Sequence, residues 1–84
     1  MKHKDIKILV VDDFPMNITL LNEILTPAGY LVDSAKNGKQ AIEKVFTDPP
    51  DLILLDVMMP EMNGYEVCRK IRENKSLPYI PVIY

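Results

Sequence analysis

Segments rich in aliphatic residues alternate along the chain with segments whose apolar residues recur at helical spacing. Aliphatic and β-branched residues dominate positions 6–11, 30–35 and 52–55, and a further run begins at position 78, which predicts four strands. The four consecutive aliphatic residues at 52–55 are typical of a strand buried on both faces of a parallel sheet. Asp33 puts a charge in the second strand and indicates that this strand lies at the sheet edge.

Three helices are predicted between these strands, because the apolar residues there recur on one helical face. The first helix begins near Pro15, which the first turn of a helix accepts, with Asp13 or Phe14 at its N-cap. It ends at Pro27 and Gly29.

The second helix follows a predicted turn at Asn37-Gly38 and ends at residues 48–50. Asn63 and Glu66 have the spacing of a capping box and begin the third helix. The residues predicted to face the core are Ile18, Leu20, Leu21, Ile24, Leu25, Ala41, Ile42, Val45, Phe46, Val67, Cys68 and Ile71. Those of the third helix predicted to face solvent are Arg69, Lys70, Arg72 and Glu73.

The resulting order, βαβαβαβ, predicts an α/β fold with a doubly wound parallel sheet and right-handed crossovers. Ligands of such sheets bind at the carboxyl ends of the strands, where the strand order reverses. If the order is 2-1-3-4, the reversal falls between the first and third strands. These two strands run into Asp12-Asp13 and into Asp56, so we expect the three carboxylates to meet in one crevice.

The composition restricts the partners of the chain. Its 84 residues make one small domain, and ten basic against twelve acidic residues offer no basic surface for a nucleic acid or a membrane. No signal-peptide pattern is present, and no apolar run approaches the roughly 18 residues of a membrane span. Cys68 is the only cysteine, so an internal disulfide is impossible and a cytoplasmic location is expected.

Carboxylates gathered in one crevice repel each other, by about 3 kcal/mol for two charges about 5 Å apart at an effective dielectric constant of about 20. Such a cluster needs a cation, or the pKa of a member rises. Oxygen ligands with room for water suit Mg²⁺, and an Asp beside Mg²⁺ can attack phosphorus to form an aspartyl phosphate. A single Asp at a strand end is more often a cap, and only the three together favour chemistry.

The residues then show a resemblance to a known family. Ile8-Leu9-Val10-Val11-Asp12-Asp13, Asn37-Gly38 and Asp56-Val57-Met58-Met59-Pro60-Glu61-Met62-Asn63-Gly64 resemble the receiver domain of two-component response regulators. The resemblance covers residues 1–84. It implies a flavodoxin-like fold with strand order 2-1-3-4.

The resemblance also implies a role for each acidic residue. Asp56 would accept a phosphoryl group from a histidine kinase or a phosphotransfer protein. Asp13 and Asp56 would bind Mg²⁺ directly, together with the backbone carbonyl of Met58, and Asp12 would help through water.

Pro60 and Gly64 would shape the loop after Asp56. Proline fixes its φ angle, and glycine is expected here to adopt a conformation closed to other residues. Ordinary turn formation explains the two residues equally well.

A complete receiver has about 120 residues and five strands, close to the commonest domain size. The resemblance therefore implies that residues 1–84 match the N-terminal two-thirds of a receiver, with the fifth strand and the last two helices missing. A Ser or Thr after the fourth strand and a Lys after the fifth would be absent with them. The chain is then expected either to self-associate through the edge from Ile80 to Tyr84 or to be only loosely folded.

Three function classes remain open: a phosphoacceptor signalling domain, an interaction or self-assembling module without switching, and a Mg²⁺-dependent aspartyl-phosphate hydrolase. The hydrolase is disfavoured because it needs a second Asp two residues after Asp56, where Met58 stands. The chain is thus expected not to be an enzyme, beyond its own phosphorylation and dephosphorylation. His3 is expected to be solvated, and the loop methionines to fill gaps in the packing.

Overall fold

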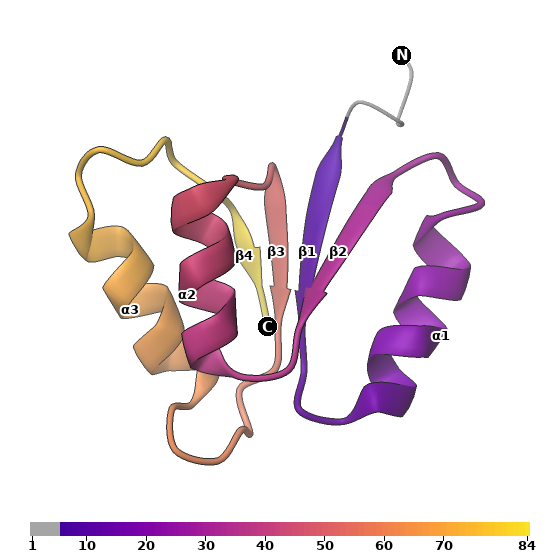
Figure 1. The fold of residues 1–84 in the computed structure, drawn as a ribbon, viewed down its shortest axis with the longest axis horizontal. Coiled ribbons are helices and arrows are strands. Elements are labelled where there is room, and N and C mark those ends of the chain that lie inside the picture. Colours follow the sequence, from indigo (N-terminus) through magenta and orange to yellow (C-terminus); the bar gives the residue numbers. More distant parts are fainter. Residues whose placement is uncertain (1–5) are drawn as a thin grey trace.

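Within residues 6–84, the central sheet of this computed structural model has four parallel strands in the order β2-β1-β3-β4 (Figure 1). The structure describes residues 6–84, so the prediction for His3 lies outside the described part. The strands are β1 Lys7–Val11, β2 Leu31–Ala35, β3 Leu52–Leu55 and β4 Val82–Ile83. The predicted alternation and the predicted strand order are both confirmed.

The helices α1 Pro15–Leu25, α2 Gly38–Thr47 and α3 Gly64–Glu73 cover the two faces of the sheet. On one face, α2 and α3 pack side by side and enclose the larger part of the core (Figure 1). The buried residues of this core are Leu9, Val11, Ala35, Ala41, Val45, Ile53, Leu55, Met59, Val67, Ile71 and Ile80. Successive residues of a strand point to opposite faces, so Ile8 and Val10 of β1 are buried on the other face, toward α1.

The face covered by α1 is thinner than the pattern predicts. Leu52 and Leu54 are only half-buried, so the prediction that β3 is buried on both faces holds for the α2–α3 face alone. Leu20 and Ile24, predicted to face the core, are 50% and 65% exposed. The reason is geometric: α1 contacts β1 and β2, and a hollow of 270 Å³ lined by residues such as Leu54 remains beside it.

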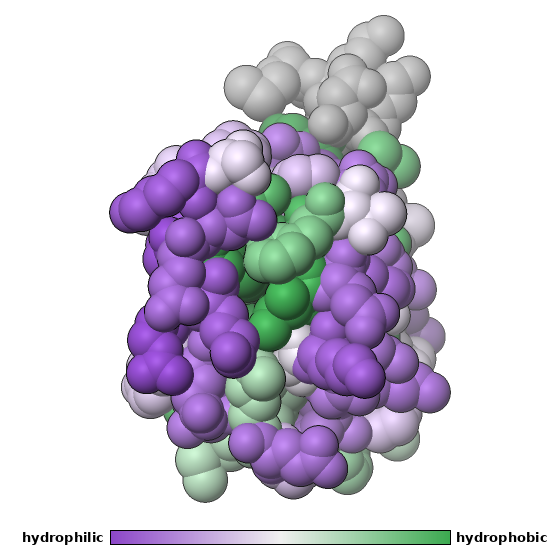
Figure 2. All heavy atoms as spheres, turned by 60° about the vertical axis from the view of Figure 1, so that its left-hand side comes forward, coloured by the Kyte–Doolittle hydropathy of each residue, from purple (hydrophilic) through white to green (hydrophobic). Residues whose placement is uncertain are grey.

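A hydrophobic strip lies between α2 and α3, bordered on both sides by hydrophilic residues (Figure 2). Ile42 and Met62 line a hollow of 420 Å³ in this region, together with Lys39, Glu43 and Lys70. Phe46 was predicted to face the core but is 47% exposed.

The helix ends follow the polar residues around them. The predicted capping box is confirmed, because the Asn63 side chain accepts from the Glu66 N–H and the Glu66 side chain accepts from the Asn63 N–H. Asn37 was predicted to form a turn but is the N-cap of α2, since its side chain accepts a hydrogen bond of 2.8 Å from the Gln40 N–H.

Two predictions near the C-terminal end of the described chain need correction. The fourth strand has only two residues, because Pro78 and Pro81 lack the N–H that a ladder requires. Arg72, predicted to be solvated, is half-buried with its guanidinium 4.4 Å from the centre of the Tyr79 ring. Among residues 6–84, no helix is both long and apolar enough to cross a membrane.

Candidate functional site

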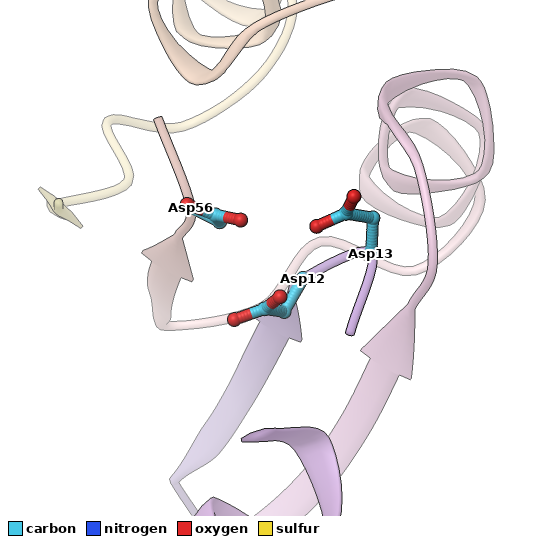
Figure 3. Close-up of side chains that lie close together, drawn as sticks. All are labelled: Asp12, Asp13 and Asp56. Atoms are coloured by element: carbon cyan, nitrogen blue, oxygen red, sulfur yellow. The ribbon is translucent and has the colours of Figure 1, made fainter. Parts of the chain in front are cut away.

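Three carboxylates meet at the carboxyl ends of β1 and β3. Asp12 and Asp13 directly follow β1, and Asp56 directly follows β3, whose register pairs Val11 with Leu55. Asp56 remains tied to the sheet, because its N–H donates to the Val11 carbonyl over 2.9 Å. One oxygen from each carboxylate lies within 4.8 Å of the others (Figure 3). The sequence therefore correctly predicted that the three residues come together.

The two acidic residues that follow β1 have different environments. Asp12 accepts at both oxygens: the Phe14 N–H donates to Oδ1 over 2.9 Å, and Asn17 Nδ2 donates to Oδ2 over 3.0 Å. Asp13 is exposed, and its carboxyl group points toward that of Asp56 (Figure 3). The sequence analysis did not predict that Asn17 contacts the cluster. An Asn in the first turn of a helix is nevertheless a signal of such a contact, because its side chain can reach nearby polar groups.

Asp56 is half-buried as a residue, and the Met58 N–H donates to its Oδ1 over 3.0 Å. Burial raises the pKa of Asp56 above its ordinary value, and the charges of Asp12 and Asp13 raise that pKa further. The hydrogen bond from Met58 acts in the opposite direction and is outweighed. The cluster thus resists holding three negative charges in the absence of a cation.

The loop after Asp56 folds tightly against the end of β3. Met62 N–H donates to the Pro60 carbonyl over 2.7 Å, and Glu61 between them has a φ angle of 67°, so the three residues form a γ-turn. Met59 points into the core and is 7% exposed, whereas Met58 is 82% exposed.

Gly64 is needed for a different reason from the one that the sequence suggested. The left-handed residue of this loop is Glu61, so the expectation that Gly64 adopts a conformation closed to other residues is wrong. A Cβ atom at Gly64 would instead lie 2.5 Å from the Asp56 carbonyl oxygen and 3.0 Å from the Val57 Cα. The absence of a side chain lets α3 begin directly against the backbone of the candidate nucleophile.

The arrangement suits a small cation with oxygen ligands. Three carboxylates offer at least one oxygen each to a common point, and such hard donors match Mg²⁺ or Ca²⁺ rather than zinc. The raised pKa of Asp56 is consistent with an incomplete charge balance that a divalent cation would restore.

Comparisons with known proteins agree with this geometry. Residues 8–84 match the response regulator receiver domain. The chain is 47% identical over 77 residues to the response regulator PleD of Caulobacter vibrioides. The aligned region covers 92% of this chain and 17% of PleD. The chain therefore spans about a sixth of that curated relative.

Solved structures agree as well. One is the response regulator protein TrrA of Thermotoga maritima, crystallised in complex with Mg²⁺-BeF. It is 45% identical to this chain, with a TM-score of 0.79, and the match covers 90% of this chain and 63% of TrrA. A complex of the histidine kinase ThkA with TrrA matches at 43% identity and a TM-score of 0.80, covering 98% of this chain and 67% of the matched one. The chain belongs to the response regulator receiver domains of two-component signalling.

Proposed function

We propose that the chain is a phosphoacceptor signalling domain in which Asp56 takes a phosphoryl group from a histidine kinase or a phosphotransfer protein. The observation that carries the proposal is the meeting of Asp12, Asp13 and Asp56 at the point where the strand order reverses. Asp56 is the favoured acceptor because the sheet fixes its backbone while one of its carboxylate oxygens, Oδ1, accepts from the Met58 N–H. Its other oxygen is then the candidate nucleophile.

In the proposed transfer, that oxygen of Asp56 forms a bond to phosphorus while the bond from phosphorus to the donor's histidine nitrogen breaks. The electron pair of the broken bond stays on the nitrogen. The Met58 N–H holds the Asp56 carboxyl group in a fixed orientation during this exchange, which reduces the entropy lost on reaching the reactive geometry. The chain itself is modified, so we propose no enzymatic role beyond its own phosphorylation and dephosphorylation.

The donor set fits Mg²⁺, with Asp13 and Asp56 as direct ligands, the Met58 carbonyl as a third and Asp12 acting through water. Both oxygens of Asp12 already accept hydrogen bonds, which favours the indirect role for this residue. When bound, the ion would offset negative charge on the phosphoryl group. The Mg²⁺-BeF complex of the relative TrrA supports this assignment.

A histidine kinase is the proposed partner, and the complex of ThkA with TrrA supports it. Free, half-buried Cys68 fits the cytoplasmic location expected from the sequence. No nucleic-acid or membrane partner is proposed, in keeping with the net charge of −2.

The test is the response of the purified chain to beryllofluoride, a phosphoryl mimic, in the presence of Mg²⁺. We expect the melting temperature to rise for the wild type and not for Asp56→Asn. Glu23→Gln, which removes an exposed carboxylate on α1, is the matched control and should respond as the wild type does. A folded wild type whose melting temperature does not change would contradict the proposal.

A second candidate is an interaction or self-assembling role for the 84-residue chain. The observation in its favour is that β4 lies at the edge of the described sheet with Ile83 and Tyr84 54% and 55% exposed. A second copy could add its own strand at this edge. Sedimentation equilibrium should then show association that weakens in Ile83→Lys, and a monomer at every concentration would exclude this role.

A further inference from the structure

Asn17 is a polar residue in the first turn of α1 whose side chain does not serve the helix. The N-cap of α1 is Phe14, whose side chain makes no capping hydrogen bond. The backbone N–H of Asn17 already donates to the Phe14 carbonyl over 3.0 Å. Asn is a weaker helix former than Ala, Leu or Lys. The residue is therefore not explained by the stability of α1.

The side chain of Asn17 turns back to the acidic cluster instead. Its Nδ2 donates to Asp12 Oδ2 over 3.0 Å, five residues earlier in the chain, while the Phe14 N–H holds Oδ1. The two donors lie on opposite oxygens, so together they fix the rotation of the Asp12 carboxyl group. Each oxygen still has a second lone pair, which can accept a hydrogen bond from water.

The chemistry of this donor matters. Asn17 is neutral, so it orients Asp12 without adding a positive charge that would repel a cation or cancel the cluster's attraction for one. A Lys or Arg at the same position would orient the carboxylate and neutralise it at once.

We propose that Asn17 is a positioning residue: by holding the Asp12 carboxylate it sets the affinity of the cluster for Mg²⁺. The inference rests on the proposed function, because it concerns the cation that the proposed phosphoacceptor site would use. It extends that function to a residue on α1 that lies outside the acidic cluster. Partners of this kind that orient a metal site are worth a measurable part of its affinity.

The test is the Mg²⁺ dissociation constant of the folded chain, measured by titration and followed by thermal shift and NMR. Asn17→Ala should weaken Mg²⁺ binding about three- to tenfold, the range expected for the loss of one ordinary hydrogen bond. The variant should fold, because Ala is the better helix former. Asn22→Ala, an exposed Asn-to-Ala change on the same helix, should leave the dissociation constant unchanged.

A double-mutant cycle separates a positioning role from a general structural one. If Asn17 acts through Asp12, Asn17→Ala should have no further effect on Mg²⁺ affinity in an Asp12→Ala background. An equal effect in both backgrounds would overturn the inference.

Other outcomes separate the inference from the proposed function. Unchanged Mg²⁺ affinity in Asn17→Ala overturns the inference and leaves the phosphoacceptor role standing. Mg²⁺ binding that weakens as expected, in a chain that takes no phosphoryl group, supports the inference and contradicts the proposed function. A wild type that binds no Mg²⁺ overturns the inference together with the metal assignment.

Discussion

Replacing Gly64 by alanine should disturb both the stability of the fold and the position of Asp56. The new Cβ would lie 2.5 Å from the Asp56 carbonyl oxygen, where ordinary contacts between heavy atoms are about 3.5 Å or more. The obstacle is backbone at the end of a paired strand, so neither a rotamer change nor a flexible side chain can relieve it. About 1 Å of movement must come from the start of α3 or from Asp56 itself.

Overpacking of this kind costs about 1–3 kcal/mol, and Ala returns less than the roughly 0.5–1 kcal/mol of a mid-helix position, because Gly64 is the first residue of α3. The net loss should be about 1–2 kcal/mol of the free energy of unfolding. A chain of 84 residues has about 4–13 kcal/mol in total, so the loss is a considerable fraction.

Urea denaturation would measure this loss of stability as a lower denaturation midpoint, with the dependence of the unfolding free energy on urea concentration unchanged. Gly38→Ala is the comparison, because its Cβ meets side chains and not backbone: Val67 Cγ2 lies at 2.8 Å and Met62 Sδ at 2.9 Å, and of these two side chains Met62 is the one flexible enough to move away. We expect a smaller loss there. A Gly64→Ala chain within about 0.5 kcal/mol of wild type, or more stable than Gly38→Ala, would contradict a backbone clash at Gly64.

Three further predictions concern charge and backbone strain. The pKa of Asp56 in the folded chain is raised above 3.8, its ordinary value in the unfolded chain. The wild type therefore loses stability as the pH rises through the interval between 3.8 and the raised pKa. Asp56→Asn should therefore be more stable than the wild type at pH 7, with no advantage below that interval, as melts across pH would show. Burial alone would raise the pKa of Asp33. Hydrogen bonds from Lys44 and the Ser34 N–H, together with the charges of Lys44 and Lys7, outweigh the effect of burial and hold the pKa of Asp33 below 3.8. Lys44→Met should thus cost less than about 1 kcal/mol at neutral pH, since the pair is half-exposed, and the difference from wild type should fade as the pH falls through that lowered pKa. Glu61→Gly should raise the free energy of unfolding by about 0.5–1 kcal/mol in urea, because it relieves a φ of 67°; a loss would contradict the strain.

The sequence predicted the architecture because its signals are local and repeated. Aliphatic runs and helical stripes alternate along the whole chain, and the capping box of Asn63 and Glu66 marks the start of α3 unambiguously. The site followed from topology, since parallel strands bring their carboxyl ends to one edge and the acidic residues stand directly after β1 and β3.

What the sequence could not supply depends on neighbours in space. Leu20 and Ile24 belong to an apolar stripe, yet they are exposed because α1 lies over only part of its face of the sheet. The role of Gly64 was assigned to its φ angle, because the distance to Asp56 has no counterpart in the sequence. The hydrogen bond from Asn17 to Asp12 crosses a turn whose shape only the structure gives.

The most direct test of the central claim is to locate the phosphoryl group after incubating the chain with Mg²⁺ and acetyl phosphate. Intact mass spectrometry would count the groups added, and peptide mapping would identify the modified residue. We expect one phosphoryl group, on Asp56, that is absent from Asp56→Asn and present in Glu23→Gln. A folded chain that takes up no phosphoryl group, or takes it up elsewhere, would contradict the account.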